Sequence, residues 1–205
     1  MSNRELATRD NILGAAKKEF LEKGYEGAWL RDIAKNAGVT TGALYGYFKN
    51  KKELFGAIVG DCYNEIQSMY ANILESFQEM AYEQQQSDME DLSIRGMIQL
   101  SDYMYDHYDE FKLILCCSKD TEYADLAAAM AHLDEEATNK FAEESVKAGM
   151  PVQRMLPRLE HILTTGLFTM FFELIIHDVP HEEAEEYITS LMHFFTAGYS
   201  GIMGF

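Results

Sequence analysis

The stretch that decides the fold is GYEGAWLRDIAKNAGVTTGALYGYFKNKKELF, residues 24–55. It contains two short helical patterns, at about residues 30–37 and 40–47, joined by a tight turn at Gly38-Val39. Glycine supplies the backbone freedom of such a turn, and the small Ala34 lets the two helices cross closely. The residues at inward spacings are Ile33, Val39, Leu44 and Phe48. This arrangement predicts a helix-turn-helix inside a three-helix unit.

The second of these helices leaves a polar outer side. The residues on or near it are Thr40, Thr41, Gly42, Tyr45, Gly46, Tyr47 and Lys49. A helix fits the major groove of DNA, and its N-terminal end can present side chains to base edges. Hydroxyls of Thr40 and Tyr45 can donate to phosphates, while Lys51 and Lys52 add positive charge. The pattern therefore favours double-stranded DNA as a partner.

Helical periodicity continues along the rest of the chain, and no stretch alternates with the period of a strand. A first helix is expected at about residues 8–23, with Thr8 as its N-cap and Gly24 as its stop. Asn50-Lys51-Lys52-Glu53 resembles a capping box that opens a long helix to about residue 77. A polar, Gln-rich loop is expected at residues 82–91. Further helices are expected at about 91–105, 109–117, 121–148 (with Gly149 and Pro151 beyond its end), 154–177 and 182–203. The fold class is all-α.

Charge is distributed unevenly along the 205 residues, whose net charge is −17. Residues 1–55 carry ten Lys and Arg against seven Asp and Glu, a net charge of +3, and the remainder carries −20. Such asymmetry points to a nucleic-acid or membrane contact at the basic end. A weakly basic, solvated face explains +3 equally well, so the charge alone does not separate the two.

Composition and motifs exclude several classes of protein. The longest nearly apolar stretch, residues 166–176, is 11 residues long and contains Glu173, against the roughly 20 residues of a membrane span. Without that span or a leader sequence, we expect a cytoplasmic protein that does not enter a membrane. No nucleophile elbow, phosphate loop or paired-carboxylate pattern occurs. We therefore expect no enzyme and no cofactor.

Cysteine and histidine offer little further chemistry. Cys62, Cys116 and Cys117 are interpreted as reduced thiols, and a redox role of the adjacent pair stays open. His177-Asp178 and His181-Glu182 could ligate a metal, but such residues are common at surfaces, and no metal site is predicted.

The stretch quoted above resembles the DNA-binding region of the TetR family of one-component transcriptional regulators, over roughly residues 8–58. The matching parts are Gly24-Tyr25, Arg31-Asp32-Ile33-Ala34, Ala37-Gly38-Val39, Leu44-Tyr45, Tyr47-Phe48, and Lys51 with Leu54. The resemblance implies that Thr40, Tyr45, Tyr47 and Lys51 contact the DNA backbone and that Thr41 and Gly42 meet base edges.

One position departs from the family pattern. Where the family has Thr or Ser at the start of the helix that corresponds to residues 30–37, this chain has Ala28-Trp29. Either one backbone anchor is missing, or Trp29 packs against sugar and phosphate, or Trp29 covers the core of the small domain; the last interpretation is favoured.

The resemblance also implies a nine-helix chain with a DNA-binding domain at residues 1–50 and a helical effector-binding and dimerisation domain at residues 51–205. In the family the last two helices form the homodimer. Apolar faces of the two C-terminal helices support this, since two such helices can form half of a four-helix bundle. The predicted interface residues are Leu163, Leu167, Met170, Phe171, Leu174, Ile188, Leu191, Met192, Phe195 and Tyr199. The alternative is that these faces build only the core of the chain.

The middle helices are expected to enclose a pocket for a small-molecule effector. The candidate residues are Tyr70, Tyr103, Met104, His107, Phe111 and Met130, although aromatic and Met residues at helical spacing more often belong to a core. An acidic body with aromatic rings favours a lipophilic cation or a neutral aromatic compound over a small anion. Alternatively, the acidity only keeps the body away from DNA and in solution.

The sequence thus predicts a ligand-responsive DNA-binding regulator, a repressor that binds a palindromic operator as a homodimer and is released by an effector. The rival is a helical interaction protein whose helix-turn-helix no longer binds DNA. Hydroxyls and Lys on the outer face of the helix at residues 40–47 favour the regulator, because a module that had lost DNA binding would have no reason to keep them.

Overall fold

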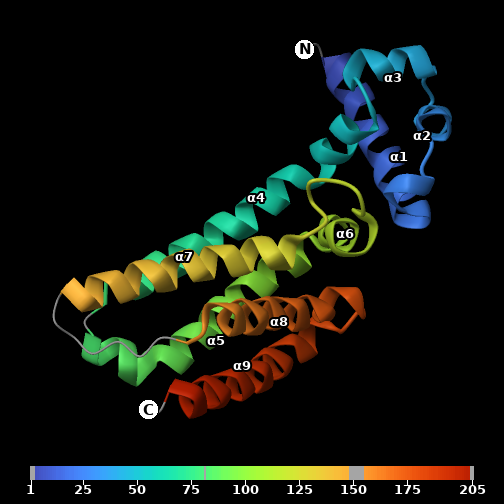
Figure 1. Cartoon of the computed structure of the whole chain (residues 1–205). Helices are drawn as coiled ribbons and strands as arrows, with labels where there is room; N and C mark the ends of the chain where they lie inside the picture. Colours follow the sequence, from blue (N-terminus) through green and yellow to red (C-terminus); the bar gives the residue numbers. More distant parts are fainter. Residues whose placement is uncertain (1–2, 81, 148–154, 204–205) are drawn as a thin grey trace. The chain divides into compact units, whose positions relative to one another are not determined.

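The computed structural model of the protein describes residues 3–80, 82–147 and 155–203, and within these residues it contains helices and no strand (Figure 1). The prediction of an all-α fold is confirmed. The N-terminal helices are α1 (Asn3–Gly27), α2 (Leu30–Asn36), α3 (Thr41–Tyr47) and α4 (Lys51–Gln78). They are followed by α5 (Tyr82–Asp106), α6 (Tyr108–Lys112), the π-helix η1 (Leu113–Cys117), α7 (Leu126–Lys147), α8 (Pro157–Ile176) and α9 (His181–Met203).

Contacts divide the chain into two compact units that are not contiguous in sequence. Unit 1 combines Met1–Asn64 with His107–Asp125, and unit 2 combines Glu65–Asp106 with Leu126–Phe205. Unit 1 therefore contains α1, α2, α3, the first half of α4, and the later segment that carries α6 and η1. These units are defined by contacts in space, whereas the domain boundary expected at residue 50 divides the chain along its sequence. That boundary stays a prediction.

The core of unit 1 fixes the short helices against α1. Phe20 and Phe55 are fully buried, and their rings meet edge to face with centroids 5.0 Å apart. Ile33 and Leu44 are fully buried and Phe48 is 2% exposed, as the inward spacings predicted. The helical path of α1 breaks at Gly24, whose φ of 70° lies in the left-handed region that favours glycine. The predicted stop at Gly24 is thus a real break, with one further turn to Gly27.

The later segment of unit 1 contacts α1 and α4. Lys17 on α1 forms an ion pair with Glu110 on α6, and η1 packs against α1. The ring of Tyr123 lies 6.0 Å from that of Phe55 and 5.2 Å from that of Tyr63. A Cβ atom added to Gly56 would lie 2.8 Å from the Tyr123 hydroxyl oxygen, so glycine permits this approach. Residues far apart in sequence therefore share one core.

Several helix boundaries differ from the sequence prediction. Thr8 is not an N-cap: α1 begins at Asn3, and the Thr8 hydroxyl donates to the Arg4 carbonyl oxygen at 2.8 Å inside the helix. The loop expected at residues 82–91 is the start of α5; Gln and Glu are good helix formers, and the segment contains no Gly or Pro. Residues 121–125 precede α7 rather than belong to it. Gly149 and Pro151, the expected end of that helix, lie outside the described residues.

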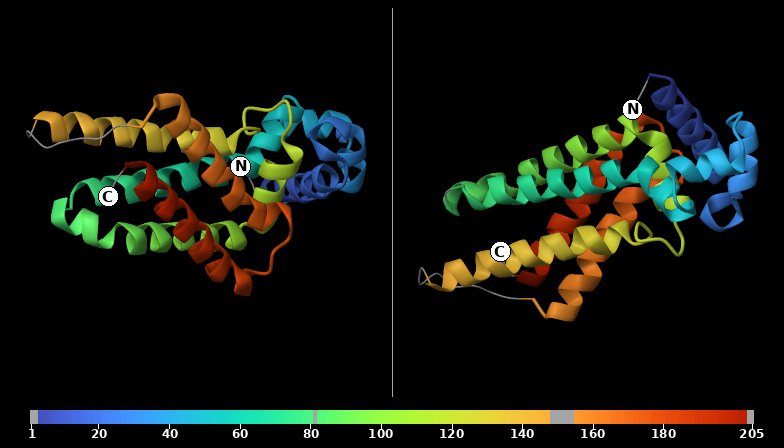
Figure 2. Two further views of the ribbon diagram at one scale, coloured as in Figure 1. Left: turned by 60° about the horizontal axis from the view of Figure 1, so that its bottom comes forward. Right: turned by 90° about the horizontal axis from the view of Figure 1, so that it is seen from above.

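Unit 2 consists of packed pairs of helices, in which α7 contacts α8, α5 contacts α9, and α8 contacts α9 (Figure 2). Pro157 occupies the first turn of α8, where its missing N–H is not needed. Of the described helices, α8 is the one whose 20 residues and mean hydropathy of 1.5 would suit a membrane span by length and composition, with a third of that window buried in the chain. A helix in the core of a protein outside membranes meets the same two criteria, so α8 does not contradict the expectation of no membrane span.

Candidate DNA-binding surface

The turn between α2 and α3 is closed by backbone hydrogen bonds. The Ala37 N–H donates to the Ile33 carbonyl oxygen at 2.9 Å, and the Val39 N–H donates to the Ala34 carbonyl oxygen at 3.0 Å. Gly38 lies between them with a φ of 70°, which a side chain would strain. The predicted turn is confirmed in its glycine and in its position.

The start of α3 is fixed by Thr40. Its backbone is extended, and its Oγ1 accepts a hydrogen bond from the Ala43 N–H at 3.1 Å. A hydroxyl that accepts in this way keeps its own proton for a further acceptor. The fully buried Leu44 holds the opposite face of α3 in the core. The outer face of α3 is thus held in one orientation.

The seven residues predicted to bind DNA extend from Thr40, the N-cap of α3, through α3 and Lys49 to Lys51 at the start of α4. Thr40, Gly42, Tyr45 and Lys49 are exposed, with Tyr45 at 51%, whereas Thr41, Tyr47 and Lys51 are half-buried. Unit 1 therefore brings all seven onto one short stretch of its surface. No ligand contact in the structure tests their roles.

Lys51 has structural partners that the sequence did not indicate. Its Nζ donates to the carbonyl oxygens of Glu26 at 3.1 Å and Ala28 at 3.2 Å, and it lies 4.7 Å from the centroid of the Tyr25 ring. Lys51 thus connects the start of α4 to the segment between α1 and α2.

The predicted cap of α4 is present in modified form. Asn50 Oδ1 accepts from the Glu53 N–H at 2.8 Å, as in a capping box. The Glu53 carboxylate accepts instead from the Lys49 N–H at 2.9 Å, one residue before the cap. This contact fixes the backbone of Lys49 and leaves its side chain exposed.

Ion pairs engage several cations of unit 1. Lys23 lies 2.6 Å from Glu19, and Lys52 lies 2.5 Å from Glu122. The hydrogen bond from Lys52 lowers the pKa of the Glu122 carboxyl. Lys52 thus has an acidic partner at the surface, and the expectation that it adds charge to the DNA-binding surface stays a prediction. For Lys35 and Lys49, no acidic partner is found within the described part of the chain.

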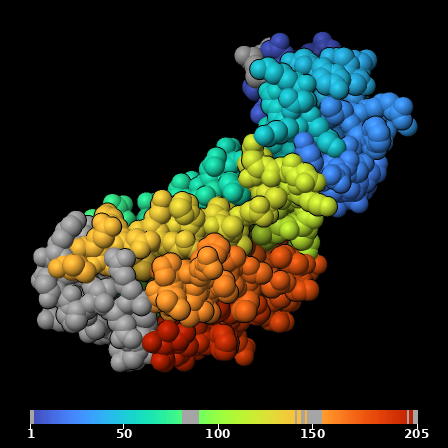
Figure 3. All heavy atoms as spheres, in the orientation of Figure 1, coloured from blue at the N-terminus to red at the C-terminus, as the bar shows by residue number. Residues whose placement is uncertain are grey.

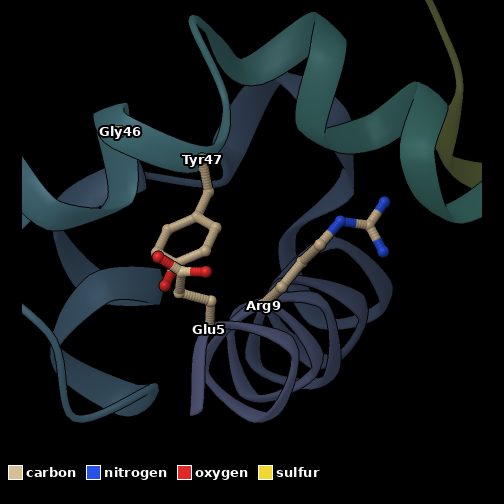
Figure 4. A pocket seen from close by; sticks show the side chains of 4 residues that line it. All are labelled: Glu5, Arg9, Gly46 and Tyr47. Atoms are coloured by element: carbon tan, nitrogen blue, oxygen red, sulfur yellow. The ribbon is translucent and has the colours of Figure 1, made fainter. Parts of the chain in front are cut away.

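A shallow pocket of about 320 Å³ lies between the start of α1 and the end of α3, lined by Glu5, Arg9, Gly46 and Tyr47 (Figure 4). The Tyr47 side chain points toward Glu5, while Arg9 extends away from them. The Arg9 guanidinium lies 5.6 Å from the centroid of the Phe48 ring. Sequence reasoning missed Arg9; its position three residues before the buried Ile12 was the available signal, because residues three apart share a helix face.

Trp29 does not cover the core. Its side chain is 68% exposed, whereas the neighbouring Ala28 is 3% exposed. Trp29 occupies the N-cap of α2 without a side-chain hydrogen bond to the helix. The favoured interpretation of Trp29 as a core residue is therefore wrong, and the surface role beside the DNA backbone stays a prediction.

We expect Trp29→Ser to raise the free energy of unfolding by about 1 kcal/mol, because a serine hydroxyl can accept from the free N–H groups of the first turn of α2. The melting temperature, measured by circular dichroism, should rise by roughly 2–4 °C. Trp29→Phe, which removes the indole without adding a cap, is the control. Equal melting temperatures for the two variants would mean that the start of α2 needs no cap.

The six predicted effector residues do not share one unit. Tyr70, Tyr103, Met104 and Met130 belong to unit 2, whereas His107 and Phe111 belong to unit 1. Tyr70, Met104, Phe111 and Met130 are buried, and Tyr103 and His107 are half-buried. None of the six lines the pocket between α1 and α3 or the pocket between α5 and α9 described below.

Unit 2 holds a polar pair of a buried Tyr70 and a half-buried Asp134. The Tyr70 hydroxyl on α4 donates to Asp134 Oδ1 on α7 at 2.5 Å. Burial raises the pKa of the Asp134 carboxyl, and it raises the pKa of the Tyr70 hydroxyl well above its usual value. Beside the pair, the Tyr70 ring meets the Phe168 ring of α8 edge to face at 5.0 Å. The Asp134 carboxyl thus lies at the hydroxyl end of a pair of aromatic rings.

Half of the predicted dimer-interface residues are buried within the chain itself. These are Phe171, Leu174, Ile188, Met192 and Phe195, none more than 7% exposed. These five side chains already pack within the single chain, and their assignment to a dimer interface stays a prediction. Leu163, Leu167, Leu191 and Tyr199 are half-buried, and Met170 is 43% exposed.

Other apolar side chains of α8 and α9 are open to solvent. On α8, Ile162 is 65% exposed, and the exposed Met170 follows it by eight residues. On α9, Phe194 is 70% exposed, and the exposed Ile202 follows it by eight residues. A spacing of eight residues keeps two side chains on one helix face. The sequence analysis missed Phe194, although its position beside Phe195 in the apolar run was the available signal.

Comparison with known proteins gives a match at the N-terminus. Residues 12–58 match the family model described as bacterial regulatory proteins, tetR family. The HTH-type transcriptional repressor BepR of Brucella suis is 47% identical over 53 residues, which are 26% of this chain and 25% of that protein. Among the first curated relatives, the matched stretch covers between 24% and 38% of their length.

Solved structures resemble the chain over nearly its whole length. Salmonella enterica GusR has a TM-score of 0.59 at 17% identity and covers 100% of this chain and 99% of its own. The transcriptional regulator FadR of Bacillus subtilis, solved in complex with stearoyl-CoA, has a TM-score of 0.57 at 16% identity. The match covers 92% of this chain and 97% of the FadR chain. At these identities the likeness shows the fold alone.

Proposed function

We propose that this chain, whose residues 12–58 match the model of the TetR family of bacterial regulatory proteins, is a ligand-responsive transcriptional regulator of the cytoplasm. In this proposal it is a repressor that binds a palindromic operator as a homodimer and leaves it when a small molecule binds. The observation that carries the proposal is the exposed surface at α3, where Thr40 caps the helix, Tyr45 lies on it, and Lys49 follows its end with no acidic partner among the described residues.

The residues of this surface divide into positioning and reading groups. Thr40, Tyr45, Tyr47 and Lys49 suit phosphates, because hydroxyls and ammonium groups donate hydrogen bonds to them. Thr41 and Gly42 lie in the first turn of α3, the part of a recognition helix that reaches base edges. Arg9 and Trp29 extend the surface on either side with a guanidinium and an exposed indole.

The test of this surface uses the protein's own fluorescence. Trp29 is the single tryptophan of the chain, so a change in emission on adding an operator duplex reports on the proposed surface directly. The operator is first selected from random duplexes with the full-length protein. Failure of that selection to enrich any sequence would favour the rival helical interaction protein.

We expect Thr41→Ala to relax sequence preference, with a loss of discrimination of at most about 1–3 kcal/mol at the base pair it contacts. Tyr45→Phe should instead weaken binding to all sequences by a similar factor, since phosphate contacts carry no sequence information. Affinities for the selected operator and its single-base variants, at one salt concentration, separate the two outcomes. Unchanged preference in Thr41→Ala would remove this residue from the readout set.

A homodimer is proposed because one seven-residue recognition helix makes few contacts, whereas two can engage half-sites about 34 Å apart. Figure 3 shows α8 and α9 side by side on one face of unit 2. Ile162 and Met170 on α8 and Phe194 on α9 are exposed. Space is also open above Gly166 and Gly198, where a partner helix could approach. A partner copy, rather than a membrane, accounts for the unusual hydropathy of α8.

The Tyr70–Asp134 pair is the proposed anchor for the effector. A carboxyl group beside the Tyr70 and Phe168 rings suits a lipophilic cation, because aromatic rings attract cations by their faces. The stearoyl-CoA of B. subtilis FadR represents the opposite chemistry, an anionic acyl compound. To move the DNA-competent population from 99% to 1%, a ligand needs about 5.5 kcal/mol of preference for the other conformer.

We expect operator release by cationic dyes to be weakened by Asp134→Asn, because the variant removes the negative charge and keeps the size of the side chain. Release by neutral aromatic compounds should change little in the same variant. Both are measured by operator fluorescence anisotropy during ligand titration, with fatty acids as the anionic arm. Release by fatty acids alone would contradict the preference for cations.

A further inference from the structure

A second pocket of about 440 Å³ lies in unit 2 between α5 and α9. Its lining residues are Ile98, Ser101, Asp102, His181, Glu182, Ala184, Glu185 and Ile188. On each helix these positions recur at intervals of three and four residues, so each helix presents one continuous face to the pocket. Ala184 and Ile188 are buried beneath it, and the four charged or titratable residues are exposed. The pocket thus has an apolar floor and a polar rim.

Ser101 is an unpaired polar group in this wall. The residue is 1% exposed, and its Oγ has no hydrogen-bond partner among the described residues. A serine in a helix commonly bonds to the carbonyl four residues before it, and no such bond is present here. A buried hydroxyl without a partner is unfavourable. A ligand that donated a hydrogen bond to this oxygen would remove that penalty.

The rim of the pocket is negatively charged. His181 Nε2 lies 2.9 Å from Asp102 Oδ1, and the Tyr105 ring stacks on His181 with centroids 4.4 Å apart. Tyr105 is in turn held by its hydroxyl, which donates to the Val179 carbonyl oxygen at 2.7 Å. This chain of contacts keeps His181 beside Asp102 at one end of the rim.

Glu182 and Glu185 complete the rim, and neither has an ion-pair partner within the described residues. No three His, Cys, Asp or Glu side chains among the described residues converge on a position that could hold a metal ion. The negative charges are therefore spread along the pocket. They suit a ligand whose positive charges are separated along a chain better than a single metal ion.

We propose that this pocket binds an aliphatic polyamine. One ammonium group lies between the Glu182 and Glu185 carboxylates, and the methylene groups cover Ile98 and Ile188. An amine N–H donates to Ser101 Oγ. Aliphatic amines are protonated at neutral pH, because their pKa lies near that of lysine. The site is distinct from the Tyr70–Asp134 pair and from the DNA-binding surface.

The proposal is tested by isothermal titration of the full-length protein with spermidine at pH 8 and constant ionic strength. Ser101→Ala and Glu185→Gln should each weaken binding by about tenfold, the ratio expected for losing one hydrogen bond or ion pair to a charged group. Glu186→Gln is the matched control. It removes the same charge from an exposed position on α9 that does not line the pocket, and it should leave binding within about twofold.

Three results would overturn the proposal. The first is equal weakening in Glu185→Gln and Glu186→Gln, which would mean diffuse attraction by the net charge of −17. The second is unchanged binding in Ser101→Ala with an unchanged melting temperature. The third is displacement of spermidine by an equal concentration of Mg²⁺, or absence of any binding. No DNA is present in the assay, so these results are independent of the proposed regulator function.

Discussion

Phe194→Asp is expected to convert the proposed homodimer to a monomer and to weaken operator binding by at least about a hundredfold, the lower end of what linking two half-site contacts contributes. Phe194 is 70% exposed in the single chain, so the substitution does not disturb the chain's own core. In the dimer it would bury an unpaired carboxylate in an apolar seam, which is strongly unfavourable. Met170→Asp should act in the same direction on α8. Sedimentation velocity and operator titration measure the two effects.

Two matched variants make this result specific. Val146→Asp places the same charge at an exposed apolar position of α7, where Val146 is 61% exposed, and should remain dimeric. Phe195→Asp changes a side chain that is 6% exposed and should instead lower the melting temperature of the single chain. If Phe194→Asp and Met170→Asp both sediment as dimers, the interface lies on another face of the molecule.

Lys51→Ala is expected to lower the free energy of unfolding by about 2 kcal/mol, because it removes two hydrogen bonds from a charged donor to the carbonyl oxygens of Glu26 and Ala28. The melting temperature should fall by roughly 4–8 °C. Lys49→Ala, two residues earlier, should leave the melting temperature unchanged. It should instead reduce the slope of log affinity against log salt by about one, the signature of one lost phosphate contact.

The comparison of these two lysines separates a contribution to the stability of the fold, expected for Lys51, from a contact with DNA phosphate, expected for Lys49. Thermal unfolding without DNA measures the first effect, and operator titrations at several salt concentrations measure the second. Lys51→Arg should retain part of the stability, because the guanidinium can still donate to carbonyl oxygens. A Lys51→Ala protein with a normal melting temperature and a reduced salt slope would return Lys51 to the role that the family resemblance implies.

The helix-turn-helix could be predicted from the sequence because its determinants are local. Gly38 is required because the turn needs a positive φ, and Thr40 because its hydroxyl accepts a hydrogen bond from the Ala43 N–H. Leu44 is required because its place in the short helix faces the core. Each of these requirements acts within a few residues, and no knowledge of the rest of the chain is needed to recognise it.

The remaining features depend on neighbours that are distant in sequence. Phe194 and Phe195 are neighbours in the sequence, and the predicted apolar face included only Phe195. The packing of α9 against α5 and α8 determines which of the two faces solvent. Lys51 carried no sign of its partners at Glu26 and Ala28, since those are backbone oxygens that any residue provides. The helical start of α5 was missed because polar residues were taken for a loop, although Gln and Glu support a helix.

The discontinuous make-up of unit 1 has a consequence for building chimeric regulators from this chain. An N-terminal piece excised at residue 64 would leave behind Glu110, the partner of Lys17, and Tyr123, whose ring lies beside those of Phe55 and Tyr63. The grafted piece would carry an uncovered aromatic surface and an unpaired lysine into its new host. The transplanted unit would stay intact if residues 107–125 were transferred together with residues 1–64. It would also stay intact in a host whose own segment places a tyrosine against Gly56, as Tyr123 does here.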